Sequence, residues 1–253
     1  MLQKTNFQVT ILRYGKLRIS GRNNLGRITS YHRGGGTHRS FRLVDFRRYV
    51  WNVPGVVSSH EYDPNRTALI NLIIYANNVA CYQLAVSGVP IAEVVTTATP
   101  RTGLEERAGF TSYLKNIKPG SYINTMEFKP FGGAQYIRAG GMYAKLVSLG
   151  LGFAIVKLRS KFLLKISSSC VATIGVLRKW ASLFFPRNNA GHTRRRGFRP
   201  SVRGVAMNPV DHPHGGGQGK TSGGRSSVSP WAMLTKGFRT RRKITYGSFI
   251  LER

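Results

Sequence analysis

The chain has 253 residues, of which 39 are Lys or Arg and 9 are Asp or Glu, so its formal net charge is +30. Most of that charge needs a partner outside the protein, and nucleic acid is the polyanion that such a surplus favours. A pocket for an acidic substrate would need only a few cations, and no basic amphipathic helix typical of membrane-surface binding is visible.

The surplus charge is concentrated at the two ends of the chain. Residues 1–60 carry 11 cations and one acid, and residues 187–253 carry 14 cations and two acids. Within these ends, the segments 21–40 and 187–243 are rich in Gly, Arg and Ser and lack apolar periodicity. We therefore expect both segments to be irregular and to be ordered only by a partner.

The middle of the chain alternates apolar and polar residues with the spacing of β-strands. Turn signals such as 63–65 and 118–120 separate the runs, and only 103–108 and 173–182 look capable of forming brief helices. Short strands without a long helical period are typical of small β-barrels. We expect strands at 68–75, 142–147, 153–158, 162–166 and 171–177.

Neither the uncharged stretch 67–92 nor the cysteines indicate a membrane or secreted protein. The stretch contains Asn71, Asn77 and Pro90, which a hydrocarbon core would penalise, so we expect no membrane span. Cys81 and Cys170 lie far apart and form no C-x-x-C pair, which excludes a zinc finger or ribbon. So few cysteines favour a reducing compartment over a disulfide framework.

The most distinctive motif is DHPHGGGQGK at 211–220, and three chemical interpretations compete for it. A phosphate-binding loop would need a glycine where His214 stands, a preceding strand and a following helix. Asp211, His212 and His214 are one ligand short of a closed metal site. Neither histidine has a nucleophile or paired carboxylate beside it for general-base catalysis. We therefore expect neither catalytic nor metal-ligating residues.

RNA contact explains the motif better, because a triple glycine flanked by His and cations occurs twice in the chain. Glycines let backbone N–H groups approach phosphate oxygens closely, and His and Arg can stack on bases or bind phosphates. The same pattern occurs at 32–39, HRGGGTHR. The cation runs 194–196 and 239–243 lack acids to balance them, which favours nucleic acid over a merely solvated face. Trp231 could stack on a base or pin the tail against the protein.

At these motifs the sequence resembles ribosomal protein two of the large subunit, the universal family, in its bacterial or organellar form. The match spans nearly the whole chain, and its motifs are long and specific. They are GRNNLGRIT at 21–29, HRGGGTHRSFRLVDFRR at 32–48, EYDPNR at 61–66, RGFRPSVRGVAMNPVDHPHGGGQGK at 196–220, SPWAMLTKG at 229–237 and RTRRK at 239–243.

The resemblance implies a mainly β fold in which an OB-like barrel is followed by an SH3-like barrel. Mapped on this chain, the boundaries are a basic N-terminal extension at 1–40, the OB-like RNA-binding barrel at 41–118, the SH3-like barrel at 119–185 and a basic Gly/Arg-rich C-terminal extension at 186–253. The strands expected from the alternation fall within the two barrels.

The resemblance also implies a non-enzymatic role in translation. The expected partners are large-subunit rRNA, neighbouring ribosomal proteins and the small subunit across the intersubunit face, with the C-terminal extension near the peptidyl-transferase region. No cofactor or small-molecule substrate is implied, and any structural Mg²⁺ would be held by the rRNA. The expected RNA contacts are Arg22, Arg27, His32, Arg33, His38, Arg39, Arg194, Arg195, Arg196, Arg203, His212, His214, Lys220, Arg225, Lys236, Arg239, Arg241 and Arg242.

Several departures from the family pattern bear on where the protein works. Gln218 stands where the motif usually has Glu, and part of the family's leading arm is missing. The match is poor over 79–109 and 147–185. Low acid content and apolar drift favour a mitochondrial version, with bacterial cytoplasm and plastid as alternatives. Lacking an Arg-rich presequence, a mitochondrial protein would be made inside the organelle or already processed. A nucleotide-hydrolysing enzyme and a DNA-coating protein remain the competing functions.

Overall fold

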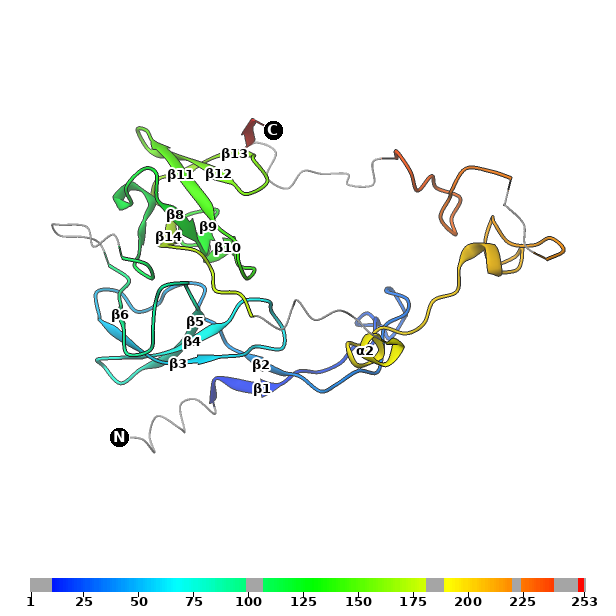
Figure 1. The fold of residues 1–253 in the computed structure, drawn as a ribbon, viewed down its shortest axis with the longest axis horizontal. Coiled ribbons are helices and arrows are strands. Elements are labelled where there is room, and N and C mark those ends of the chain that lie inside the picture. The colour runs from blue at the N-terminus through cyan, green and yellow to red at the C-terminus, as the bar shows by residue number, and fades with distance from the viewer. Residues whose placement is uncertain (1–10, 99–106, 181–188, 220–223, 239–249, 253) are drawn as a thin grey trace. The chain divides into compact units, whose positions relative to one another are not determined.

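The computed structural model is mainly β and describes residues 11–98, 107–180, 189–219, 224–238 and 250–252 (Figure 1). These residues belong to two compact units. The first contains the described residues within Met1–Lys16, His38–Phe185 and Tyr246–Arg253, and the second those within Leu17–Thr37 and Pro186–Thr245. Among the described residues, no helix is long and apolar enough to cross a membrane.

The first unit begins with a four-stranded antiparallel sheet, which forms the OB-like part of the fold. Its order is β5-β4-β3-β6, with β3 at Gly55–Glu61, β4 at Ile70–Tyr75, β5 at Ala80–Leu84 and β6 at Val94–Val95. The central strand β4 is buried on both faces, since Ile73 packs with Val57 while Ile70 packs with Tyr82 in a separate cluster. A strand covered on both sides needs a nearly continuous apolar sequence.

A seven-stranded sheet forms the SH3-like part of the same unit, in the order β15-β13-β12-β11-β8-β14-β7. Its strands alternate in burial, so that Leu146, Val156 and Leu164 point into one core while their neighbours face outward. The strands are β7 Thr111–Tyr113, β8 Tyr122–Asn124, β11 Ala144–Leu149, β12 Phe153–Leu158, β13 Leu163–Ser167, β14 Val171–Ile174 and β15 Ile250–Glu252.

Two small antiparallel pairs and three short helical turns complete the described elements. β1 pairs with β2, and β9 pairs with β10. Their bounds are β1 Arg13–Gly15, β2 Ser40–Arg42, β9 Met126–Glu127 and β10 Ala134–Tyr136, and the helical turns are η1 Leu114–Asn116, α2 Ala190–Arg195 and η3 Gly204–Ala206.

The structure confirms the mainly β fold and the expected strands, and it corrects one detail. The helix expected at 173–182 is absent from its described residues, because Thr173 and Ile174 end strand β14. β7, which lies before residue 118, pairs with β14 of the second sheet. β15 returns from the expected C-terminal extension to the edge strand β13. Most of the helix expected at 103–108 lies outside the described residues.

The buried carboxylate of Glu127 connects two loops of the second barrel. Its Oε1 accepts a hydrogen bond from the backbone N–H of Gly133 at 2.9 Å, and its Oε2 accepts one from Val171 at 3.1 Å. The first bond closes the turn between β9 and β10, and the second holds the start of β14. Hydrogen bonds to a charged acceptor are stronger than neutral ones, so this residue stabilises the junction.

The two cysteines are free, with Cys170 buried and Cys81 partly buried. Desolvation, and then the charge of Glu127, raises the pKa of Cys170 to about 12. Desolvation, followed by the charge of Asp45, raises the pKa of Cys81 to about 11. Both thiols are therefore protonated at neutral pH. Because an exposed thiol ionises near pH ~8.5, the unfolded state loses these protons first, and the free energy of unfolding falls as the pH rises from ~8.5 towards 11–12.

Substituting Glu127 by Ala should lower the free energy of unfolding by about 2–4 kcal/mol, because two buried N–H groups lose their acceptor. Urea unfolding followed by tryptophan fluorescence measures the change. Glu93→Ala is the matched control, since the Glu93 side chain makes no hydrogen bond or ion pair with the described residues, and it should stay within about 0.5 kcal/mol of the parent. Equal losses in both variants would show that Glu127 does not hold the junction.

Candidate nucleic-acid interface

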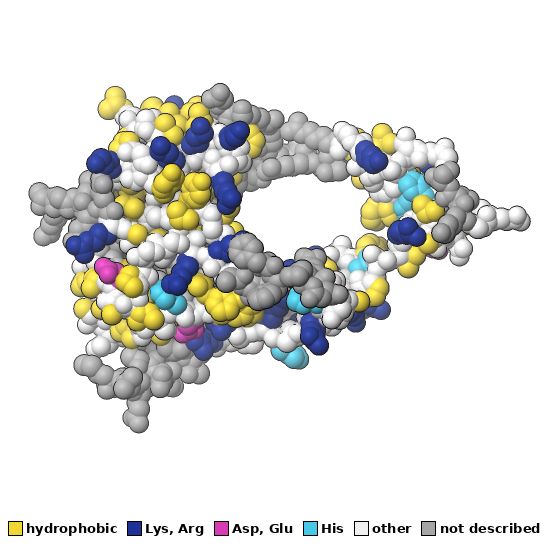
Figure 2. Space-filling model, in the orientation of Figure 1, with side chains coloured by type: hydrophobic (Ala, Val, Ile, Leu, Met, Phe, Trp, Pro, Cys, Tyr) yellow, Lys and Arg dark blue, Asp and Glu magenta, His cyan; other side chains and the backbone are white. Residues whose placement is uncertain are grey.

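The predicted contact residues have no carboxylate partners within the described part of the chain. Ion pairs join Arg13 to Glu61 and Arg66 to Asp63, and neither pair includes a predicted contact residue. Lys and Arg side chains spread over the face shown in Figure 2, where carboxylates are scarce. These cations therefore remain available to an external anion such as phosphate.

Residues 21–30 of the second unit form a compact loop that presents two predicted contacts. The carbonyl of Gly21 accepts hydrogen bonds from Thr29 and Ser30, and the side chain of Asn23 accepts from the backbone N–H groups of Leu25 and Arg27. A bridge between Arg22 and Ile28 closes the loop. The side chains of Arg22 and Arg27 are exposed on this rigid turn.

The first triple glycine, at 34–36, lies against the basic end of α2 and the residues that follow it, within the same unit. Gly34 donates its N–H to the carbonyl of Gly197 at 3.0 Å, and Thr37 donates to that of Arg195 at 2.8 Å. A Cβ at Gly36 would lie 2.7 Å from the Arg195 carbonyl oxygen, and the residue has φ +91°, so only glycine fits here. The segments 21–40 and 187–243, which we expected to be ordered only by a partner, are thus joined to each other by backbone hydrogen bonds.

Side chains reinforce this pairing and bring several predicted contacts together. His32 Nδ1 donates to the carbonyl of Pro200 at 3.0 Å, and the Arg33 guanidinium lies 4.2 Å from the centroid of the Phe198 ring. Arg194, in the last turn of α2, donates to the carbonyl of Phe198. These contacts bring Arg33 together with Arg194, Arg195 and Arg196, while Arg22 and Arg27 lie on the loop 21–30 of the same unit.

Arg18 is a structural residue that the sequence analysis missed. Its Nη1 donates to the carbonyl oxygens of Gly35 at 3.1 Å and Gly36 at 2.7 Å, which fixes the triple glycine from the other side. Nothing in the sequence distinguishes Arg18 from the other cations of the N-terminal segment, because its partners are backbone atoms.

His212 is buried, with 8% of its surface exposed, and its ring belongs to the interior of its own loop. The backbone N–H of His214 donates to His212 Nδ1 at 3.0 Å, so Nδ1 is an acceptor and the ring proton is on Nε2. A Cβ at Gly204 would lie 2.6 Å from the ring, and one at Gly215 would lie 2.2 Å from the Asn208 carbonyl. The motif is thus a tightly packed loop in which His212 is the central support.

His214 connects this loop to a short hairpin that carries Trp231. The backbone N–H of Val228 donates to His214 Nε2 at 3.3 Å, and Val228 pairs with Leu234 in a β-bridge. Trp231 lies at the tip of the hairpin with 68% of its surface exposed. Of the two roles left open by the sequence, stacking on a base therefore agrees better with the structure than pinning the tail.

The remaining predicted contacts are distributed as follows. Arg203, Arg225 and Lys236 are exposed in the second unit, while His38 and the half-buried Arg39 belong to the first. Lys220, Arg239, Arg241 and Arg242 lie outside the described residues. In the part of the chain that the structure describes, no three His, Cys, Asp or Glu side chains cluster as metal ligands would.

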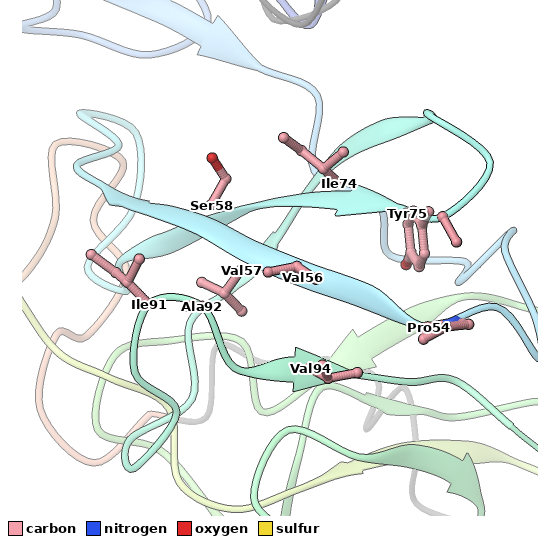
Figure 3. A pocket seen from close by; sticks show the side chains of 10 residues that line it. Pro54, Val56, Val57, Ser58, Ile74, Tyr75, Ile91, Ala92 and Val94 are labelled. Carbon is pink, nitrogen blue, oxygen red and sulfur yellow. The ribbon is translucent and has the colours of Figure 1, made fainter. Parts of the chain in front are cut away.

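An apolar hollow of about 620 Å³ on the first sheet is unsuited to phosphate (Figure 3). It lies beside β3, β4 and β6 and is lined mainly by aliphatic side chains such as Val56, Ile74, Ile91 and Val94. No cation lines it, so it does not belong to the interface described above.

Comparison with known proteins identifies relatives of both halves of the chain. The family "Ribosomal Proteins L2, RNA binding N-terminal domain" matches residues 10–97, and "Ribosomal Proteins L2, C-terminal domain" matches residues 107–232. The chain is 45% identical over 246 residues to the large ribosomal subunit protein uL2 of Hyphomonas neptunium, covering 97% of this chain and 88% of the relative. It is 43% identical to uL2 of Maricaulis maris, covering 94% and 84%. It is 44% identical to uL2m of Reclinomonas americana, covering 96% and 87%.

Substituting Gly36 by Ala should separate the first triple glycine from the end of α2, because the new methyl group would collide with the Arg195 carbonyl. Trypsin should then cleave the free protein faster after Arg194, Arg195 and Arg196, as mass spectrometry of the fragments would show. Gly26→Ala is the matched control. It has a similar φ of +75° but nothing within 4 Å of the added Cβ. Equal cleavage rates in the two variants would mean that the pairing does not protect this segment.

Proposed function

Because the chain belongs to the ribosomal protein L2 family, we propose that it binds large-subunit rRNA, supports the peptidyl-transferase region and helps the two subunits to associate. The family is a structural component of the large ribosomal subunit rather than an enzyme, and its N-terminal domain is an RNA-binding domain.

The observation that carries the proposal is the group of cations in the second unit that have no carboxylate partner among the described residues. Arg194, Arg195 and Arg196 project from the end of a short helix whose backbone is fixed by the first triple glycine. Lys and Arg bound to phosphates release condensed counterions, and this release supplies much of the affinity of such proteins for nucleic acid. Phosphate contacts of this kind position the protein on folded RNA.

The packed loop around His212 suits it to a supporting role near the peptidyl-transferase region. Its ring is held by a backbone hydrogen bond and is closely approached by Gly204, so it stiffens the loop instead of offering a catalytic base. In this proposal the RNA carries out any catalysis, and the protein supports the folded RNA. The only ion that it allows is structural Mg²⁺ held by the rRNA.

We place the protein in the mitochondrial ribosome, with bacterial cytoplasm and plastid as the alternatives. The match to a uL2m protein supports this assignment, and the bacterial relatives have similar identity. The rRNA to which the protein binds distinguishes these compartments, because its own sequence identifies its source.

Crosslinking the protein in cells and sequencing the attached RNA tests the function and the compartment together. We expect the reads to concentrate on large-subunit rRNA around the peptidyl-transferase region, from the mitochondrial gene. Reads from large-subunit rRNA far from that region would contradict the proposed location. Reads scattered over DNA or unrelated transcripts would contradict ribosomal function.

Replacing Arg194, Arg195 and Arg196 together by Ala should reduce the salt dependence of rRNA binding. Each phosphate contact contributes about −0.7 to −0.9 to the slope of log K against log salt, so the slope should flatten by about 2–3. Filter binding at several salt concentrations measures it. The matched control replaces Lys145, Lys157 and Lys161, exposed lysines of the second barrel. If the control flattens the slope equally, the three arginines are not specific contacts.

A further inference from the structure

A cleft of about 420 Å³ in the first unit gathers aromatic rings from loops far apart in the sequence. Tyr49 and Trp51 come from the loop before β3, Tyr113 from the end of β7, and Phe131 from the turn after β9. Arg47 adds a cation to the lining. This volume lies within the range of about 300–1,000 Å³ that is usual for small-molecule sites.

The loop that contributes to one side of the cleft is fixed by Asp45. Its Oδ1 accepts hydrogen bonds from the backbone N–H groups of Arg47 at 3.0 Å and Arg48 at 2.8 Å, and its Oδ2 accepts one from Tyr49 at 3.3 Å. Arg48 is buried, with 4% of its surface exposed, and its Nη2 donates to Thr173 Oγ1 of β14 at 3.0 Å. The loop is therefore bound to the second sheet, which preorganises the cleft.

The rings of Trp51 and Tyr113 are already stacked. Their centroids are 5.1 Å apart and their planes differ by 29°. The ammonium group of Lys115 lies 5.5 Å from the centroid of Tyr113 and adds a second cation beside the pair. A stacked aromatic pair with cations beside it is a platform on which a nucleobase can continue the stack.

The other two rings are exposed in a way that packing within the protein does not explain. Tyr49 and Phe131 expose 74% and 84% of their surfaces. Phe131 also has φ +62°, an unfavourable conformation for a bulky side chain. The surrounding turn imposes it, since Gly132 donates to the Lys129 carbonyl and Gly133 to the Glu127 carboxylate. Strain of this kind tends to occur where a ligand is clamped.

We propose that this cleft binds a nucleobase of the rRNA that is turned out of its own stack. The proposal rests on the rRNA binding proposed above and adds a base contact to it. The cations Arg47 and Lys115 favour an anionic partner such as RNA over a protein segment. The one carboxylate in the lining, Glu127, is buried and accepts hydrogen bonds from two backbone N–H groups, so it does not pair with these cations. A stacking site of this type accepts any base, since every base has a π-face.

Fluorescence of Trp51 reports directly on the proposed stacking. Replacing Trp180 and Trp231 by Phe leaves Trp51 as the only tryptophan of the full-length protein. The probes are a single-stranded oligoadenylate and an abasic ribose-phosphate oligomer of the same length, whose binding is followed separately by anisotropy. We expect the oligoadenylate to quench Trp51 emission and the abasic oligomer to bind without quenching.

The other outcomes separate this proposal from the proposed function. If both oligomers bind and Trp51 emission does not change, or changes equally with both, the base site is wrong while RNA binding stands. If neither oligomer nor rRNA binds, the RNA-binding function itself fails, and the base site fails with it.

Variants of the exposed rings test the site in rRNA without threatening the fold. Phe131→Ala and Tyr49→Ala should each weaken binding roughly 5- to 140-fold, the usual effect of removing one base-stacking ring. Tyr122→Ala is the matched control, because Tyr122 is an exposed aromatic of β8 outside the cleft, and it should leave the affinity unchanged. Unchanged rRNA affinity in both cleft variants, with loss of a neighbouring protein from purified subunits, would overturn the proposal in favour of a protein contact.

Discussion

Four carboxylates hold the loops and edges of the first unit together, and the freedom of the cations depends on this use of the few acids. Asp45 accepts three backbone hydrogen bonds in the loop before β3, and Glu127 accepts two between β9 and β14. Glu61 binds Arg13 and the hydroxyl of Tyr82, and Asp63 binds Arg66 and the backbone of Asn65. A carboxylate that is bonded in this way is unavailable to a distant Lys or Arg, so the remaining cations are left for an external polyanion.

The second unit is stabilised differently, because Asp211 is the only acidic residue in its sequence. Carboxylates cannot organise its loops, and backbone groups and glycines take over that task. Gly34 and Thr37 bond to the end of α2 and the residues that follow it, and the loop around His212 closes on Asn208 and Met207. Such bonds fix the backbone without neutralising charge. The mutual repulsion of the cations therefore opposes folding of this unit, and binding to phosphate removes that cost.

The sequence predicts most reliably the features that repeat along the chain. Alternating residues found β12 at Phe153–Leu158 and most of β4, because each strand buries one face or both. The helix expected after Thr173 is wrong, since the β-branched Val171, Thr173 and Ile174 favour the strand that β7 and β8 complete. Short strands such as β6, which depend on pairing with β3, have too few residues to show a period.

The candidate sites likewise differ in whether their residues are neighbours in the sequence. Cation runs and glycine triplets are local, so the sequence could predict contact residues in the second unit but not the pairing of its two halves. The aromatic cleft has no local signal, because its rings come from residues 49 to 131 and meet only when both sheets are folded. The role of His212 as an internal support was likewise hidden, since it depends on the close approach of Gly204 and on the backbone N–H of His214.

The two kinds of contact would respond differently to salt, and this difference gives each unit its own role in recognition. Phosphate contacts from the second unit weaken as ions compete for them, whereas stacking of a base on Trp51 and Tyr113 displaces no counterion. Phosphate contacts attract and orient the RNA over a broad surface, but they carry no information about which nucleotide is bound. The proposed cleft would accept any base, so its place on the rRNA would be set by where the folded RNA turns a base out of its stack. If both proposals hold, the second unit attracts the RNA and the first unit binds it at a site selected by the shape of the RNA.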